Sequence, residues 1–153
     1  MSNIREAVEA DIPRLLELYA QLALNSTETY YAEPEPDFNR KALTEIQATP
    51  GLHLLVAEQD GDVVGTCMLC ILPGLSRGIA RWAVIEYVVV EKKLRSKGIG
   101  QAIMDHAVKM AEEAGCYKVM LCSNKKRTDA HRFYQRLGFE QTHLAFHRYF
   151  GKH

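Results

Sequence analysis

The chain has 153 residues, 47% of them hydrophobic and 25% charged, which is the composition of one folded globular domain and excludes general disorder. Nineteen basic residues balance nineteen acidic ones, and this net charge of zero argues against nucleic acid as the main partner. No apolar run approaches the ~20 residues that cross a bilayer, and the N-terminal segment carries Glu6, Glu9 and Asp11 where a signal peptide is apolar, so we expect a cytoplasmic protein without a membrane partner.

The first 50 residues predict one strand, two helices and a loop. Residues 3–8 are strand-like. Asp11 is expected to cap a helix that has Pro13 in its first turn and leucines at a helical period. Residues 27–38 contain two prolines and predict a loop, and a second helix is expected over residues 39–47.

Three strands are predicted in the middle of the chain. Residues 53–58 and 63–71 are strand-like, and Asp60-Gly61 between them is a hairpin turn signal. After a break at 73–76, residues 81–90 form the most apolar run of the chain, which predicts a strand buried on both faces. These strands predict an antiparallel meander.

The cysteines are predicted to be free thiols that behave as small buried hydrophobes. Cys67 and Cys70 form a C-x-x-C, but on a strand such positions point to opposite faces, and no second pair completes a zinc site. Metal or redox chemistry is the less favoured alternative. Cys122 as an acyl carrier is also disfavoured, because nothing in the sequence places a base beside it.

The second half of the chain predicts a crossover. The segment EKKLRSKGIG leads into a helix that ends at Ala114 with Gly115 as its cap, and residues 117–122 form another buried strand. Asp129 is expected to cap a last helix, and residues 143–150 alternate weakly and predict a final strand. The whole order indicates one α/β (α+β) domain over residues 1–153, a mixed sheet covered by helices.

The glycine-rich turn at residues 95–100 is the first candidate site. It precedes a helix, whose free N–H groups and dipole favour an anion, and Arg95 and Lys97 add positive charge. A phosphate cradle and a tight connection with nothing bound both fit this pattern. The sequence lacks a P-loop, and Ile103 stands where a dinucleotide fingerprint needs its third glycine.

Glu86 and Tyr134 are the candidates for proton transfer. Glu86 interrupts the most apolar strand, where desolvation would raise the pKa of its carboxyl group and suit it to act as a general base. A solvated carboxylate or a structural ion pair is the alternative. Tyr134 lies on an amphipathic helix, so either core packing or proton donation by its hydroxyl explains it.

A basic cluster follows the last buried strand of the sequence. It can bind an anion or form a solvated face. Its members are Lys125, Lys126, Arg127, His131, Arg132 and Arg136.

The chain resembles the GNAT superfamily of acetyl-CoA-dependent N-acetyltransferases in the strand VIEYVVV, the R-x-x-G-x-G turn, the strand VMLCSN and the segment AHRFYQRLGF. The resemblance covers nearly the whole chain. Its most specific part is the turn at 95–100 combined with the A-x-x-F-Y-x-x-x-G-F pattern about 30 residues later.

This resemblance implies a mostly antiparallel mixed sheet that is splayed in the middle, with acetyl-CoA as the acetyl donor. It implies Glu86 as the general base, acting directly or through water, and Tyr134 as the general acid. The pantetheine arm is expected on the strand backbone and the pyrophosphate on the turn. The implied cofactor-binding residues are Val88, Val89, Val90, Arg95, Ser96, Lys97, Gly98, Ile99, Gly100, Gln101, Asn124, Arg127, His131 and Arg136.

A narrower resemblance concerns residues 123–134 and 138–143, which are similar to the aminoalkylphosphonate N-acetyltransferases. The glucosamine-phosphate N-acetyltransferases are similar in size and in the central strand that carries Glu86. Both act on small amines that bear an anionic group, so the expected function is direct acetyl transfer to such an amine, without a metal. Arg77 and Arg81 are expected to flank the acceptor from the other side. The resemblance also implies a homodimer.

Two other function classes stay open. A non-catalytic acetyl-CoA-binding regulator would keep the phosphate cradle without turnover. An acetyltransferase acting on a polyamine, an amino acid or a protein amine would keep the chemistry with another acceptor.

Overall fold

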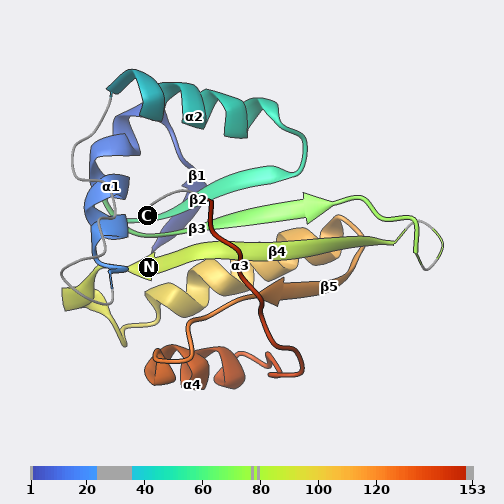
Figure 1. Cartoon of the computed structure of the whole chain (residues 1–153). Coiled ribbons are helices and arrows are strands. Elements are labelled where there is room, and N and C mark those ends of the chain that lie inside the picture. The colour runs from blue at the N-terminus through green and yellow to red at the C-terminus, as the bar shows by residue number, and fades with distance from the viewer. Residues whose placement is uncertain (1, 24–35, 77, 79, 151–153) are drawn as a thin grey trace. The chain divides into compact units, whose positions relative to one another are not determined.

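The computed structural model describes residues 2–23, 36–76, 78 and 80–150, and it divides into a first unit, residues 1–120, and a second unit, residues 121–153. A five-stranded sheet has its strands side by side in chain order (Figure 1). The first four strands pair antiparallel, and the fifth runs parallel to the fourth in Figure 1, so the predicted mixed α/β sheet is confirmed. The strands are β1 (Asn3–Glu6), β2 (Leu52–Gln59), β3 (Asp62–Leu72), β4 (Arg81–Val90) and β5 (Cys116–Leu121).

The helices connect these strands in the order that the sequence predicts. Two short 3-10 helices occur at Glu9–Asp11 and Lys92–Leu94. The α-helices are α1 (Ile12–Ala20), α2 (Pro36–Ala48), α3 (Ile99–Glu113), which connects β4 to β5, and α4 (Thr128–Arg136) in the second unit. None of the helices within the described residues is long and apolar enough to cross a membrane.

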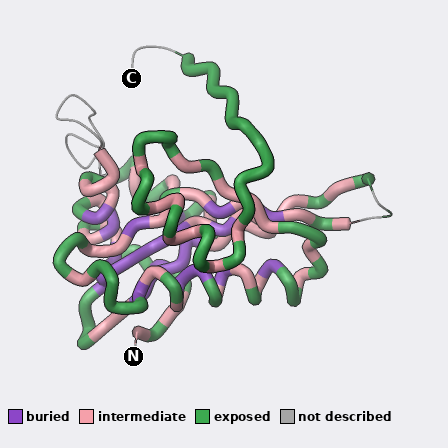
Figure 2. The backbone as a smooth tube through the Cα atoms, turned by 90° about the horizontal axis from the view of Figure 1, so that it is seen from below, coloured by how far each residue is buried: buried purple, intermediate pink, exposed green. Residues whose placement is uncertain are grey.

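The core of the first unit lies on both faces of the sheet. On one face, α1 and α2 pack on a cluster that contains Leu15, Leu43, Leu54 and Val89. On the other face, α3 buries the side chains of Ile99, Ile103, Met104, Ala107 and Ala111. Buried residues follow the strands in Figure 2. Because neighbouring strand residues point to opposite faces, each strand residue can be assigned to the α1–α2 face or to the α3 face.

Two boundary predictions are corrected at the first two helices. Helix α2 begins at Pro36, inside the segment predicted to be a loop, because proline is well tolerated in a first helical turn. Asp11 does not cap α1 with its side chain. Its carboxylate accepts hydrogen bonds from the Val8 N–H at 2.8 Å and from the Arg5 guanidinium at 2.7 and 3.0 Å instead.

The predicted final strand over residues 143–150 is wrong. These residues adopt neither helix nor strand, and the segment is exposed along its length (Figure 2). Leu144 and Phe146 are among its exposed apolar side chains. Strand conformation is stabilised by pairing with a neighbour, and weak alternation alone gives this segment no buried face.

The four cysteines are free, as predicted. Cys67 is buried, and burial raises the pKa of its thiol to about 12. Cys70 and Cys116 are half-buried, whereas Cys122 is exposed, so the expectation of a buried thiol is wrong at Cys122. That cysteine lies just beyond the end of β5, where the chain leaves the sheet.

Candidate active site

Strand β4 contains a bulge directly after Glu86. The register pairs Glu86 with Met68 and Val89 with Thr66, so β4 has one more residue than β3 between these pairs. Tyr87 has φ +52°, a left-handed conformation that is uncommon for a residue with an aromatic side chain. Bulges change the direction of side chains and occur often beside functional sites.

Glu86 lies on the α1–α2 face of the sheet. Met68 packs against the apolar cluster of that face, and the two members of a cross-strand pair point to the same side. Cys70, two residues from Met68, shares this face. Burial, and then the charge of Glu86, raise the pKa of the Cys70 thiol. The half-buried Glu86 side chain therefore belongs to the sheet face on which α1 and α2 pack.

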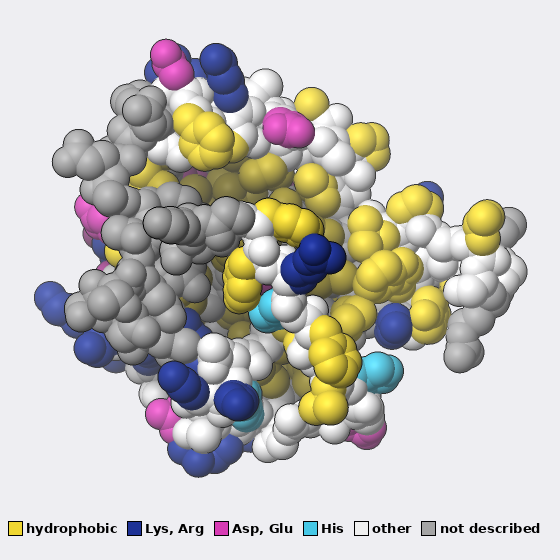
Figure 3. All heavy atoms as spheres, viewed as in Figure 1, with side chains coloured by type: hydrophobic (Ala, Val, Ile, Leu, Met, Phe, Trp, Pro, Cys, Tyr) yellow, Lys and Arg dark blue, Asp and Glu magenta, His cyan; other side chains and the backbone are white. Residues whose placement is uncertain are grey.

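An apolar cavity of about 300 Å³, here called the α1–α2 groove, lies on the same face. In Figure 3, hydrophobic side chains gather beneath α2 in this region. The Tyr87 ring, next to Glu86 in the chain, packs edge-on against Tyr19 of α1 with ring centroids 5.8 Å apart. The groove is lined by Ile12, Leu15, Leu16, Tyr19, Phe38, Asn39, Ala42, Leu43, Ile46, Leu54, Met68 and Tyr87.

The turn between β4 and α3 has the backbone shape of an anion site. Ser96 and Gly98 both have positive φ, at +63° and +84°. Helix α3 then starts without a side-chain cap, and the Ala102 N–H donates to the Gly98 carbonyl at 3.0 Å. The N–H groups before Ala102 thus have no carbonyl partner inside the helix, and they lie at its positive dipole end.

The side chains around this turn are mostly cationic and exposed. Lys92, Lys93, Arg95 and Lys97 lie within six positions of one another. The Arg95 Nε donates to the Val90 carbonyl at 3.2 Å, which closes the turn on the end of β4.

The other predicted binding residues of this region differ in exposure. Val89 and Ile99 are buried, Val88, Val90 and Gly100 are half-buried, and Gln101 is exposed.

A network that sequence reasoning missed fixes the start of this turn. The Glu91 carboxylate accepts from Arg14 at 2.6 Å and from the Gln21 amide at 3.1 Å. The Glu91 N–H donates to the Val64 carbonyl at 2.8 Å. Arg14, and then Gln21, lower the pKa of the Glu91 carboxyl group to about 2. The network ties α1 to the turn and neutralises a carboxylate beside the candidate anion site.

Glu91→Gln should lower the free energy of unfolding by about 1–3 kcal/mol at pH 7, because it removes a charged, partly buried hydrogen-bond acceptor. The folded-state pKa lies below the ordinary 4.5, so this stabilisation is present above pH 4.5 and is lost as the pH falls toward 2. Denaturant unfolding at pH 7 and pH 3 measures the difference between wild type and variant, which should shrink at pH 3. Glu17→Gln breaks only the exposed pair with Arg14 and should change stability little. An equal loss of unfolding free energy at pH 7 and pH 3 would contradict a stabilising role for the ionised Glu91 carboxylate.

Gly98→Val should weaken acetyl-CoA binding by at least ~10-fold relative to Ser96→Ala. A β-branched residue is strained by ~1–2 kcal/mol at φ +84°, and relief of this strain would move the backbone N–H groups at the start of α3. Gly100→Val, in the first turn of α3, should act in the same direction. Gly61→Val is the matched control: φ is +87°, an added Cβ meets nothing within 4 Å, and the hairpin is remote in sequence. Calorimetric titration with acetyl-CoA gives the affinities. Equal affinities for the Gly98 and Ser96 variants contradict the cradle.

In the second unit, Asn124 organises the segment between β5 and α4. Its side-chain oxygen accepts from the Lys126 N–H at 3.0 Å, an Asx turn. Its carbonyl accepts from the Arg127 N–H and from His131 Nε2, both at 2.9 Å. Asn124 and His131 therefore have structural contacts, and His131 Nε2, which must carry the proton to donate to a carbonyl, is engaged.

The basic cluster is only partly available. Lys125, Lys126 and Arg136 are exposed, and Arg127 is half-buried. Arg132 pairs with Asp129 one turn away on α4. The prediction that Asp129 caps α4 is wrong, because the N-cap position is Arg127 and the Asp129 carboxylate pairs with Arg132 inside the first turn instead.

Tyr134 packs within an aromatic group of the second unit. Its ring lies 5.3 Å from Phe133 and 6.2 Å from Phe139, measured between centroids. The Phe139 N–H donates to the Tyr134 carbonyl at 3.1 Å, and this hydrogen bond stabilises the C-terminal end of α4. The ring thus has the packing role that the sequence left open. Glu86 belongs to the first unit and Tyr134 to the second, so their joint action stays a prediction.

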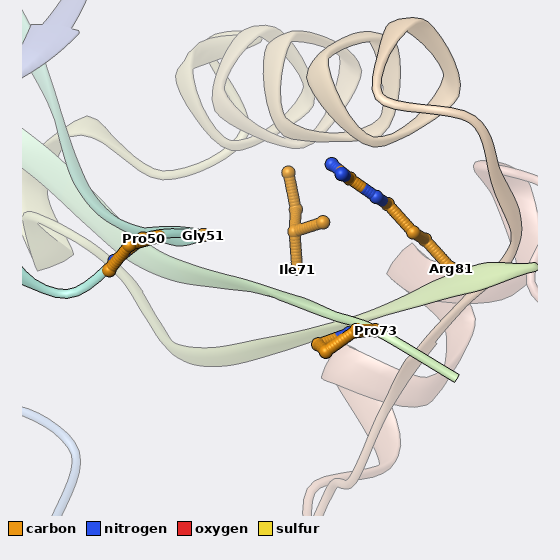
Figure 4. A pocket seen from close by; sticks show the side chains of 5 residues that line it. All are labelled: Pro50, Gly51, Ile71, Pro73 and Arg81. Carbon is orange, nitrogen blue, oxygen red and sulfur yellow. The ribbon is translucent and has the colours of Figure 1, made fainter. Parts of the chain in front are cut away.

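The structure does not bring Arg81 to Glu86. The register is regular from Trp82 to Glu86, so Arg81 and Glu86, five residues apart, point to opposite faces of the sheet. Arg81 lies on the α3 face, together with Ala83 and its cross-strand partner Ile71. Figure 4 shows Arg81 and Ile71 side by side in a separate pocket of about 210 Å³, lined also by Pro50, Gly51 and Pro73. Arg77 lies outside the described residues.

Comparison with known proteins gives a consistent result. Residues 15–139 match the model of the Acetyltransferase (GNAT) family. The chain is 37% identical over 98 residues to an aminoalkylphosphonate N-acetyltransferase of Salmonella typhimurium, a match that covers 63% of this chain and 62% of that relative. It is 30% identical over 139 residues to a glucosamine 6-phosphate N-acetyltransferase of Trypanosoma brucei brucei, covering 90% of this chain and 88% of the relative.

Among solved structures, a transcriptional regulator from Bacillus halodurans C-125 superposes with a TM-score of 0.90 at 31% identity. The superposition covers 98% of this chain and 100% of that one.

Proposed function

The chain belongs to the GNAT family of acetyltransferases, and from that premise we propose that it transfers the acetyl group of acetyl-CoA to the primary amine of a small anionic acceptor. The observation that carries the proposal is the bulge of β4. The bulge directly follows Glu86, which its pairing with Met68 puts on the face of the α1–α2 groove, and the same strand runs on into the cationic, uncapped start of α3. A candidate base and a candidate anion site are thus built on one continuous strand, turn and helix.

GNAT acetyltransferases use acetyl-CoA as the acetyl donor, and the turn at 95–100 has the chemistry to hold its pyrophosphate. The backbone N–H groups of Gly98, Ile99, Gly100 and Gln101 supply donors. Arg95 and Lys97 supply charge, and the neighbouring Glu91 carboxylate is paired with Arg14. Val88, Val89 and Val90 are proposed to offer backbone groups to the pantetheine arm. In the second unit, Asn124, Arg127, His131 and Arg136 are proposed to contribute further cofactor contacts.

Bound acetyl-CoA supplies an activated thioester. Glu86 accepts a proton from the acceptor ammonium, directly or through a water molecule, and the freed amine forms the new C–N bond at the thioester carbonyl. A backbone N–H beside Val88 donates to the carbonyl oxygen as negative charge develops there. The C–S bond of the thioester then breaks, Tyr134 donates its phenolic proton to the departing thiolate, and the second proton lost by the attacking nitrogen restores the phenol through solvent. General acid–base assistance contributes ~10²–10⁴-fold, and positioning adds to it.

The anionic acceptor is supported by the names of two relatives. One acts on an aminoalkylphosphonate and the other on glucosamine 6-phosphate, and both substrates pair an amine with a phosphorus oxyanion. In this chain the exposed Lys125 and Lys126 are the proposed contacts for the acceptor's anionic group. Zero net charge supports a small-molecule acceptor over nucleic acid, and a cytoplasmic homodimer remains part of the proposal.

An aminoalkylphosphonate should exceed the amino alcohol of the same chain length by at least ~10-fold in kcat/KM, the equivalent of ~1.4 kcal/mol, since charge-assisted hydrogen bonds contribute ~1.5–3 kcal/mol each. Competition between the two acceptors for limiting enzyme measures the ratio directly. Spermidine is the control for a simple preference for amines. If the amino alcohol or spermidine is the better acceptor, the anionic acceptor is wrong and acetyl transfer to another amine stands.

A non-catalytic acetyl-CoA-binding regulator is the second candidate. It is favoured by the likeness to a protein from Bacillus halodurans that is titled a transcriptional regulator. Such a protein would bind acetyl-CoA and release no thiol with any amine. The presence of both Glu86 and Tyr134 supports the enzyme over the regulator.

A further inference from the structure

The α1–α2 groove has a lining that suits hydrocarbon. Eleven of its twelve lining residues are apolar or aromatic, Asn39 is the exception, and no lysine or arginine is among these described lining residues. Phe38 is 65% exposed and Tyr87 is 49% exposed, although both rings border the groove. Covering such apolar surface with a hydrocarbon group is favourable in proportion to the area removed from water.

The groove is adjacent to Glu86 through two separate contacts of the strand. Tyr87, the next residue in β4, and Met68, the cross-strand partner of Glu86, both line it. A molecule that presents its amine to the Glu86 carboxylate therefore has the groove beside the carbon atoms that carry the amine.

The volume limits the occupant. About 300 Å³ lies at the lower end of the ~300–1,000 Å³ that small-molecule sites span. An anion is a poor occupant, because burying a charge among apolar side chains without a cation is costly, and the Glu86 carboxylate next to the groove would repel it.

We propose that the groove binds an apolar substituent of the acceptor, carried on or next to the carbon that bears the amine. The inference rests on the proposed function, and it narrows the acceptor to an amphiphilic amine. Such an amine has its anionic group outside the groove and a short alkyl or aryl branch inside it.

The test is a series of 1-aminoalkylphosphonates with one to five carbons, assayed for kcat/KM by thiol release. Each added methylene should raise kcat/KM by about fourfold until the groove is full, the equivalent of ~0.8 kcal/mol per methylene. A flat or falling series overturns the inference and leaves acetyl transfer intact.

A pair of variants on α2 connects the series to the groove. Ala42→Leu adds carbon atoms to the lining and should reduce the rate advantage of the five-carbon acceptor over the one-carbon acceptor at least threefold. Glu45→Leu makes the same kind of change on the exposed side of the helix and should keep the wild-type ratio. Thermal unfolding verifies that both variants are folded. Equal ratios in the two variants overturn the assignment to this groove.

A binding measurement separates the two proposals. If no amine is acetylated, the proposed function fails, and calorimetric titration of the same phosphonates then decides the groove. Affinity that rises with chain length in wild type and not in Ala42→Leu supports the groove without catalysis. Affinity that does not depend on chain length overturns it.

Discussion

Replacing Glu86 by glutamine is expected to lower kcat by ~10²–10⁴-fold, because the variant keeps the shape of the side chain and cannot accept the proton of the acceptor ammonium. The acidic limb of the pH–rate profile should change, since that limb reports the base. Calorimetric titration should give an acetyl-CoA affinity near that of the wild type, because the turn at 95–100 is untouched. Loss in kcat and kcat/KM together identifies an interaction that acts in the transition state.

Glu58→Gln is the matched control for this variant. Glu58 is a half-buried carboxylate on β2, and it pairs with Arg5 at 2.7 Å instead of bordering the groove. Its replacement should cost some stability and leave kcat unchanged. A wild-type rate and an unaltered pH profile in Glu86→Gln would reduce Glu86 to a structural carboxylate.

Tyr134→Phe is expected to lower kcat by ~10²-fold or more, because it removes only the proton donor to the thiolate. The ring contacts with Phe133 and Phe139 do not depend on the hydroxyl, so the variant should keep the fold and lose at most about one hydrogen bond, ~1 kcal/mol. Steady-state kinetics and thermal unfolding of the same preparation give the two quantities.

The control for the tyrosine is Tyr117→Phe. Tyr117 lies on β5 and is exposed, so the same loss of a hydroxyl should leave kcat near the wild-type value. Full activity in Tyr134→Phe would show that the residue serves packing alone, the role that its aromatic neighbours already support.

The strands and helices of this fold were predictable where the local pattern was strong. Residues 81–90 form β4 with the predicted boundaries, because a run of apolar and β-branched residues favours a strand. The predicted burial of both faces is too strong, since only Ala83, Ile85 and Val89 of this strand are buried. Helix α3 starts at Ile99 and is followed by Gly115 with φ +78°, as its apolar period and cap indicate. The failed strand at 143–150 shows the reverse, since pairing depends on a partner that local alternation does not supply.

The position of Glu86 in the sequence was predictable, but the bulge beside it was not. No glycine or proline marks the bulge, and Tyr87 is a residue type that normally avoids φ +52°. Tertiary contacts accompany this conformation, among them the Tyr19 ring of a helix far away in the chain. The bulge accompanies a contact between β4 and α1, two elements far apart in the chain, so the residues around Tyr87 do not predict it.

The network around Glu91 escaped prediction for the same reason. Arg14 and Glu91 are 77 positions apart, and each taken alone is an ordinary charged residue. Asn124 and His131 were predicted as cofactor contacts from resemblance, and the structure adds the turn that they build together. Chemistry-bearing residues were thus found by type and order, while the contacts that position them required the folded chain.

The most direct test of the function is thiol release from acetyl-CoA in the presence of 1-aminoethylphosphonate, with mass spectrometry of the amine product. Wild-type protein is predicted to release one thiol for each amine acetylated, with the rate reduced ~10²-fold or more in Glu86→Gln. Tight binding of acetyl-CoA with no thiol released for any phosphonate, amino-sugar phosphate, polyamine or amino acid would contradict it.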